Sequence, residues 1–283
     1  MLARPIRELH YRFESSAGGQ RPGHHRSRGG YSGFEFRAHA PLQDAPDARR
    51  IDLQASLRDP FGNWIVRLHS QRRAIAVAIV ADLSASMAFV GSAPKQEVLA
   101  DLADSLAWSA WRTGDSFAFV GCDEHVRPEF LLAPTRSRGA AMALTQTLRG
   151  AGLHGHSAQA LHEAHRHLPQ RRGLVFVVSD FHLPLADVGA ALDSLAPHQV
   201  VPVVLWQAAE FALAQRRGLV QVLEPESGHR QWLWWRPALR QRWLAAREAR
   251  REALLQVFAA RRLAPLFIEG RFDADAVTRH FIA

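Results

Sequence analysis

The sequence predicts an α/β fold whose central sheet is doubly wound, mostly parallel and covered by helices on both faces. Two stretches, residues 74–81 and 174–178, are apolar runs of strand length. Strands that are buried on both faces have this composition, whereas strands of a half-exposed sheet alternate between apolar and polar residues. Segments with helical periodicity follow each run and alternate with further strand-like segments, as a doubly wound sheet requires.

The elements of this sheet can be placed in chain order. After the strand at 74–81, a helix runs through 95–111 with Val98, Leu102, Leu106 and Ala110 on one face, and Gly114 closes it. Strands follow at 116–122 and 128–134, the latter with prolines at both margins, as in an edge strand. Helices at 138–148 and 157–167, the strand at 174–178, a helix at 185–196 and a strand at 200–206 complete the alternation. One member of the sheet is expected to be antiparallel.

Residues outside this alternation form two further parts. We expect a basic, family-specific N-terminal segment at 1–73, the core at 74–210, and a C-terminal extension at 211–283 that packs on the core. The extension contains a hairpin whose turn lies at 226–229, a long helix over 238–262, a strand at 264–270 and a short terminal helix.

Composition restricts the class of protein. The chain has 283 residues, of which 47% are apolar and 22% charged, so it is long enough and apolar enough for a packed core. No run approaches the roughly 18 apolar residues of a membrane helix, and the first residues lack the apolar stretch of a signal peptide. Cys122 is the only cysteine, which excludes an intramolecular disulfide and fits a reducing compartment. We expect a soluble cytoplasmic protein.

The charge is unevenly distributed. Residues 1–73 and 227–283 each carry an excess of six basic side chains, whereas residues 74–226 carry an excess of four acidic ones. An acidic centre between basic flanks favours a cation site over a nucleic-acid cleft in the centre. Lys95 is the only lysine among 35 basic residues, and the sequence assigns it no function.

Oxygen-bearing side chains follow both apolar strands. Asp82, Ser84 and Ser86 come directly after the first, and Asp180 follows the second. Ser157, at the start of a predicted helix, is a further candidate. In open α/β sheets ligands bind at the carboxyl ends of the strands, and Mg²⁺ prefers hard oxygen ligands while retaining several waters. The pattern predicts a Mg²⁺ or Mn²⁺ site with a position left for a partner's carboxylate; the simpler interpretation of the first triplet is a helix N-cap.

This pattern resembles the metal-ion-dependent adhesion site of von Willebrand factor type A domains, whose signature is Asp-x-Ser-x-Ser, then Thr, then Asp. Asp82, Ser84 and Ser86 match the first part and Asp180 the last, while Ser157 stands where the family usually has Thr. The resemblance implies a von Willebrand factor A-like fold in which the strands bearing Asp82 and Asp180 are neighbours. Both carboxylates would then face one crevice.

A second resemblance covers nearly the whole chain. Residues 23–41 and 49–59 resemble the bacterial family of domain of unknown function fifty-eight, with matches at Ser27, Arg28, Glu35, Phe36, Arg37, Ile51 and Asp52. The chain departs from the family pattern where residues 41–44, Pro-Leu-Gln-Asp, replace a Pro-Gly-Asp-Asp turn, where about three residues are inserted before Ile51, and where Leu53 replaces a Trp.

Membership of that family would imply a non-enzymatic function. Its members resemble accessory proteins of MoxR-type AAA+ ATPases, thought to assemble, activate or insert metal into client complexes, and some accompany methanol dehydrogenase genes. Many of them carry two membrane helices ahead of this region. The chain would then be an adaptor whose cation site binds an acidic residue of the ATPase or of its client.

Two other functions have support in the sequence. His154, His156, His162, His165 and His167 lie close enough together to suggest a zinc hydrolase, although they lack the spacing of a zincin helix, so that a solvated histidine-rich helix is favoured. The segment 230–262 is basic and aromatic, as in a nucleic-acid or peripheral membrane helix. Its stripe of Leu239, Trp243, Ala246, Ala253 and Val257 favours packing on the sheet instead.

Several single residues near the predicted site have two interpretations. His182 either lines the metal crevice or is an ordinary loop residue. Asp123 and Glu124 either add negative potential around the cation or are turn residues. Cys122 is expected to be a small core residue.

Overall fold

The computed structural model describes residues 6–13, 22–26, 35–70, 72–211, 218–223 and 229–282. The chain forms two compact units, one of residues 13–75 and one that combines the segment before Phe13 with the chain from Ala76 onward. The boundary between Ile75 and Ala76 lies two residues after the expected end of the N-terminal segment at residue 73. The described residues before Phe13 belong to the larger unit, which the sequence did not indicate.

The smaller unit is built from two antiparallel strand pairs and two short helical segments. Strand β1 (Pro22–Arg26) pairs with β4 (Arg72–Arg73), and β2 (Glu35–Pro41) pairs with β3 (Ile65–Ser70). Between β2 and β3 lie the 3-10 helix η1 (Ala48–Arg50) and helix α1 (Leu53–Leu57). At the altered Pro-Leu-Gln-Asp segment the chain still turns, because the Asp44 N–H donates to the Pro41 carbonyl at 3.0 Å. Ser27 and Arg28 lie outside the described residues.

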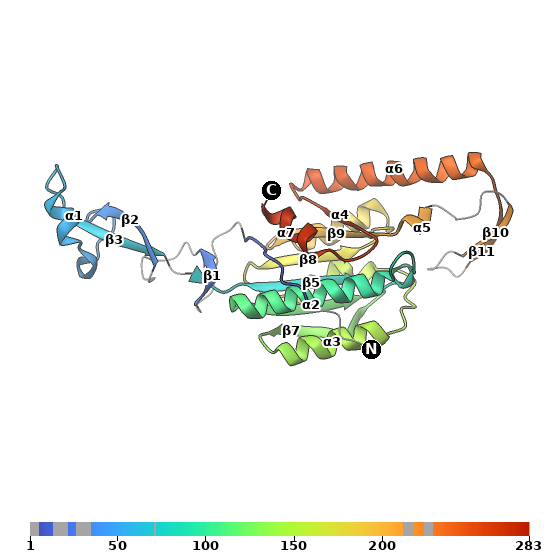
Figure 1. Ribbon diagram of the computed structural model, residues 1–283, viewed down its shortest axis with the longest axis horizontal. Helices are drawn as coiled ribbons and strands as arrows, with labels where there is room; N and C mark the ends of the chain where they lie inside the picture. The colour runs from blue at the N-terminus through green and yellow to red at the C-terminus, as the bar shows by residue number, and fades with distance from the viewer. Residues whose placement is uncertain are drawn as a thin grey trace. The chain divides into compact units, whose positions relative to one another are not determined.

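The larger unit contains a six-stranded sheet with the order β12-β9-β8-β5-β6-β7 (Figure 1). All neighbouring pairs are parallel except β6 and β7. The predicted doubly wound, mostly parallel sheet with one antiparallel member is therefore confirmed. The strands are β5 (Ala76–Asp82), β6 (Ser116–Cys122), β7 (Val126–Thr135), β8 (Leu174–Ser179), β9 (Gln199–Trp206) and β12 (Leu266–Glu269).

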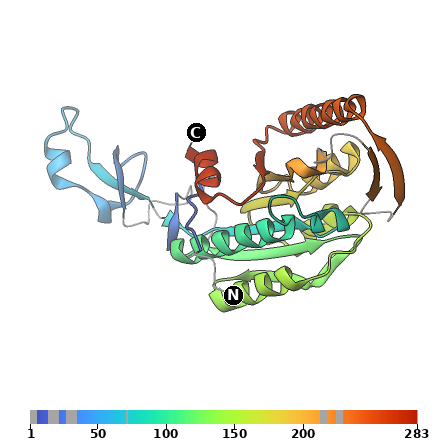
Figure 2. The same cartoon turned by 45° about the vertical axis from the view of Figure 1, so that its right-hand side comes forward.

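Helices cover both faces of this sheet. Alternate residues of the central strands, such as Ala78 and Val80, share a core with the 3-10 helix η3 (Gln159–His167), α4 (Leu185–Ser194) and the end of α6 (Pro237–Ala260). The opposite face contacts α2 (Lys95–Thr113), which packs side by side with α3 (Arg138–Gly150) (Figure 2). Phe281 of α7 (Ala274–Ile282) contacts Phe176 on β8.

Two predicted helices differ from expectation. The segment predicted as a helix over 157–167 is a 3-10 helix that begins at Gln159, and the Nδ1 of His165 donates to the carbonyl of His162 three residues earlier. Both types of helix would bury Ala160, Leu161 and Ala164, so the apolar pattern does not distinguish them. In α6 only Leu254 and Phe258 are buried. None of the five residues of the predicted stripe is buried; Val257 is partly buried against the core, and the two buried side chains each lie one position after a stripe residue.

The C-terminal extension contributes to the sheet itself. The hairpin of β10 (Gly218–Leu223) and β11 (Arg230–Trp235) is antiparallel as predicted, although residues 226–228 of the predicted turn lie outside the described residues. After α6, strand β12 adds an edge to the core sheet by pairing with β9. Within the described part of the chain, no helix combines the length and apolar character needed to cross a membrane.

Candidate functional site

The carboxyl ends of β5 and β8 meet at the centre of the sheet. The two strands are parallel neighbours, with Ala81 opposite Val178, so Asp82 and Ser179 come next to each other. The Ser179 hydroxyl donates to the Asp82 carboxylate at 2.6 Å, and Asp180 follows directly. This arrangement places Asp82 and Asp180 at the same end of the sheet, where open α/β proteins bind ligands.

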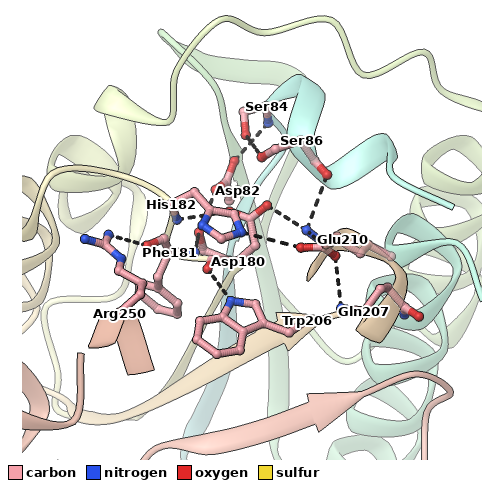
Figure 3. A network of polar contacts seen from close by, with 12 residues as sticks. Asp82, Ser84, Ser86, Asp180, Phe181, His182, Trp206, Gln207, Glu210 and Arg250 are labelled. Atoms are coloured by element: carbon pink, nitrogen blue, oxygen red, sulfur yellow. Dashed lines mark hydrogen bonds and ion pairs between the residues drawn. The ribbon is translucent and has the colours of Figure 1, made fainter. Parts of the chain in front are cut away.

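The Asp-x-Ser-x-Ser segment folds back on itself at this end. The Ser84 N–H donates to Asp82 Oδ1 at 2.9 Å, and the Ser84 and Ser86 hydroxyl oxygens lie 3.2 Å apart. The turn continues into the 3-10 helix η2 (Ala85–Ala88). Asp82 is only 1% exposed, and both serines are buried. Figure 3 shows Asp82, Ser84 and Ser86 close together. The structure therefore brings three of the five predicted oxygen ligands together.

The fourth predicted ligand lies in a loop that is fixed beside this segment. Ser84 forms an isolated parallel bridge with Gly155, and the Ala85 N–H donates to the Gly155 carbonyl at 2.8 Å. Ser157 is two residues further along this loop and is half-buried. The loop is therefore held beside Ser84 at Gly155, two residues before Ser157.

The fifth predicted ligand, Asp180, has a partner that sequence reasoning missed. Lys95, the first residue of α2, places its ammonium 2.8 Å from Asp180 Oδ2 and 3.0 Å from Glu210 Oε1. Lys95 is 1% exposed. A buried ammonium is costly unless carboxylates pair with it, and here two do. The signal that could have indicated Lys95 is its status as the only lysine in an arginine-rich chain.

The two aspartates differ electrostatically. Burial, followed by the negative charge of Asp180, raises the pKa of Asp82 to about 6. Burial would also raise the pKa of Asp180, but the positive charges of Lys95 and His182 outweigh it and lower the pKa below its usual range. Asp180 is therefore held as a carboxylate by its cationic neighbours.

His182 and Glu210 extend the site toward a neighbouring cavity. His182 Nε2 lies 3.4 Å from Glu210 Oε2, and the imidazole is parallel to the Trp206 indole at a centroid distance of 6.2 Å. The Trp206 indole N–H donates to the Asp180 carbonyl at 2.8 Å. Asp180, His182 and Glu210 line a cavity of about 830 Å³, together with Ser86, Lys95, Arg247 and Arg250. His182 therefore lines the cavity beside the predicted site.

The predicted histidine cluster does not form a metal site. Within the described residues, which include all five histidines from His154 to His167, no group of three or more His, Cys, Asp or Glu side chains is placed to hold a metal ion. The Nδ1 atoms of His162 and His165 instead contact backbone carbonyls of η3. Among the described residues, these histidines therefore do not form the ligand cluster that the zinc hydrolase interpretation requires, because the His162 and His165 rings contact the backbone of their own 3-10 helix.

The remaining polar candidates have structural partners. Asp123 accepts a hydrogen bond from Arg127 at 2.7 Å and another from the His125 N–H at 3.0 Å. Glu124 accepts one from the N–H of His156. Both acids act as turn residues. Cys122 is buried, as predicted, and burial raises the pKa of its thiol to about 12.

The donor set fits a hard divalent cation in its chemistry. The Asp82 carboxylate and the Ser84 and Ser86 hydroxyls supply oxygens from one short segment, as Mg²⁺ and Mn²⁺ prefer. Asp180 adds a second carboxylate, whose Oδ2 contacts the Lys95 ammonium.

Comparisons with known proteins identify a matching family and a similar relative. Residues 41–253 match the family described as Protein of unknown function DUF58. A relative from Paracoccus denitrificans, described as an uncharacterized protein in the moxR 3' region, is 37% identical over 106 residues, which span 36% of this chain and 96% of the relative.

Similar solved structures include BatB from Bacteroides thetaiotaomicron, with a TM-score of 0.46 and 12% identity over 74% of this chain and 98% of that one. The VWA domain of SpRpn10 has a TM-score of 0.43 and 10% identity, covering 74% of this chain and 94% of that one.

Proposed function

The chain belongs to the DUF58 family, and from that premise we propose that it is a non-enzymatic accessory protein whose cation site binds an acidic residue of another protein. The observation that carries the proposal is the convergence of Asp82, Ser84 and Ser86 at the end of β5, beside Asp180 at the end of β8. These oxygens would hold Mg²⁺ or Mn²⁺, with Ser157 completing the set. The bound cation would supply positive charge for a partner's carboxylate.

The proposed partner is a MoxR-type AAA+ ATPase together with its client complex. The support is the Paracoccus denitrificans relative, which is described as an uncharacterized protein in the moxR 3' region. In this proposal the ATPase performs the turnover chemistry. The chain presents the cation, and its different affinities for two states of the partner couple docking to the partner's conformation.

The metal site is tested first by thermal unfolding after chelator treatment, with and without millimolar Mg²⁺ or Mn²⁺. An ion that binds only the native state raises the free energy of unfolding by about 2.7 kcal/mol at a hundredfold excess over Kd. We expect this increase in the wild type and its loss in Asp82→Ala. Asp123→Ala is the matched control, because Asp123 is also a buried carboxylate at a strand end but pairs with Arg127. It should lower the melting temperature and keep the metal effect.

The docking step is tested with the purified chain and the MoxR-type ATPase of the same genome. We expect binding in Mg²⁺, loss of binding in chelator, and loss in Asp82→Ala but not in Asp123→Ala. Equal binding by the Asp82 variant would contradict the proposal. A nucleic-acid function of the basic flanks remains the alternative prediction; that binding would weaken linearly with log salt and survive Asp82→Ala.

A further inference from the structure

We propose that Lys95 is an internal cation of this site and competes with the divalent ion for Asp180. The inference rests on the proposed metal site and concerns its regulation. With the ammonium on Asp180, the site keeps only the oxygens of the Asp82–Ser86 segment and of Ser157. Divalent binding then requires Lys95 to leave Asp180 and rely on its other carboxylate, Glu210.

The position of the ammonium supports direct competition. Lys95 Nζ lies 2.8 Å from Asp180 Oδ2 and 3.5 Å from the Ser86 carbonyl oxygen, so it contacts both segments that supply the predicted ligands. An ion held by Asp180 and Ser86 would come close to this ammonium. Two like charges in a buried site repel strongly because water does not screen them.

Glu210 gives Lys95 an alternative partner outside the ligand set. Its Oε1 lies 3.0 Å from Nζ, slightly farther than Asp180. The Gln207 N–H donates to the same oxygen at 2.9 Å, and His182 Nε2 lies 3.4 Å from the other. These contacts fix Glu210 in the first turn of α5 (Ala208–Phe211), where it already contacts Lys95 (Figure 3). A small movement of the lysine side chain could therefore release Asp180 and keep the pair with Glu210.

The charge of Lys95 also opposes a divalent cation at this site. Asp82, Asp180 and Glu210 carry negative charge when ionised, and Lys95 offsets part of it, beside the basic side chains of His182 and Arg250 that line the same cavity. Lys95 therefore reduces the attraction of the site for the divalent ion without removing it. An exposed lysine would have little effect of this kind, but the side chain of Lys95 is 1% exposed.

The experiment measures Mn²⁺ dissociation constants by calorimetry on the full chain after chelator treatment. Lys95→Met removes the internal cation, and we expect Mn²⁺ to bind at least tenfold more tightly. Glu210→Gln removes the alternative partner, so that Lys95 stays on Asp180, and we expect binding at least threefold weaker. Arg127→Met is the matched control, because it removes a cation paired with Asp123 at a neighbouring strand end, and should leave the constant unchanged.

The opposite signs distinguish competition from a structural role. If Lys95 only orients Asp180 or stabilises the fold, Lys95→Met will leave binding unchanged or weaken it, which overturns the inference. Glu210→Gln binding Mn²⁺ as tightly as the wild type, or more tightly, also overturns it. Circular dichroism checks that each variant is folded, and Lys95→Gln, which retains a neutral hydrogen-bond donor, replaces Lys95→Met if that variant unfolds.

The outcome also separates this inference from the proposed function. Wild-type binding that is lost in Asp82→Ala, with no gain in Lys95→Met, leaves the metal site standing and removes the competition. If neither the wild type nor Lys95→Met binds Mn²⁺, both the proposed metal site and the competition by Lys95 are contradicted.

Discussion

At the scale of single residues, Asp52 of the smaller unit interacts with a helix N-terminus and with two basic side chains. It caps α1 by accepting from the Ala55 N–H at 3.1 Å, and it also contacts Arg67 Nε at 2.7 Å and His39 Nε2 at 3.0 Å. The hydrogen bond from Arg67, followed by that from the Ala55 N–H, lowers the pKa of Asp52 well below its usual range. A carboxylate with a lowered native pKa stabilises the fold above its unfolded pKa, about 3.9, and loses that effect as pH falls through the native value.

We therefore expect Asp52→Asn to destabilise the smaller unit at pH 7. The difference from the wild type should shrink as pH falls below about 4, because Asp52 then binds a proton in the unfolded state while the native carboxylate is still ionised. Hydrogen exchange of residues 35–70 at several pH values measures this effect. Asp44→Asn, at an exposed carboxylate of the same unit, should change little. A difference between Asp52→Asn and wild type that does not depend on pH would contradict the assignment.

The residues of the candidate site differ in how far sequence could predict them. Asp82, Ser84 and Ser86 lie within five residues and follow an apolar run, so their proximity is a local property. Lys95 is 85 residues from Asp180, and a lysine at the start of a helix is normally solvated. Its burial depends on Glu210, which the sheet topology brings near only when β9 lies beside β8. No local pattern contains that information.

At the scale of elements, Gly173 lies just before β8, where the chain approaches the backbone of β5 closely. A Cβ at Gly173 would lie 2.4 Å from the Ala76 carbonyl oxygen, which is backbone of the central strand. We expect Gly173→Ala to lower the free energy of unfolding by about 1–3 kcal/mol, because the two strands must separate to accept the methyl group. Urea unfolding measures the difference.

Gly150→Ala is the control for that substitution. Gly150 ends α3, and a Cβ there would meet nothing within 4 Å. Alanine should leave stability unchanged or raise it by up to about 1 kcal/mol through its higher helix propensity. Equal effects of the two substitutions would contradict the close approach of β8 to β5.

The elements of the core sheet were largely predictable because its strands and most of its helices have a local apolar pattern, whereas β1 and β4 of the smaller unit have none and were not predicted. The helical pattern did not predict which side of α6 is buried. The buried residues Leu254 and Phe258 each lie one position after a member of the predicted stripe, Ala253 and Val257. The buried positions depend on which elements lie beside the helix, and the stripe does not contain that information.

At the scale of the whole molecule, the division into two units was only partly predictable. The boundary near Ala76 coincides with the start of an apolar strand. The return of the first residues to the larger unit depends on long-range contacts: the Leu9 N–H donates to the Ser109 hydroxyl, 100 residues away, and the Leu9 side chain is buried. The basic, mixed sequence at 1–73 does not indicate that its first residues pack on the unit formed by the chain after residue 75.

Tyr11 tests this division of the chain. Its hydroxyl donates to the Asp115 carboxylate at 2.6 Å, just after the end of α2, and burial, followed by the charge of Asp115, raises the pKa of Tyr11. Tyr11→Phe keeps the ring and removes this donor, while Thr113 still donates to Asp115 at 2.8 Å. We expect the larger unit to lose about 1–3 kcal/mol of unfolding free energy, because a buried carboxylate loses a hydrogen bond.

Hydrogen exchange measures this loss in each unit separately. In Tyr11→Phe it should show faster opening across 76–211 and no change across 35–70, the reverse of Asp52→Asn. Faster exchange of both units in Tyr11→Phe would mean that the two unfold together and that the first residues do not belong to the larger unit alone.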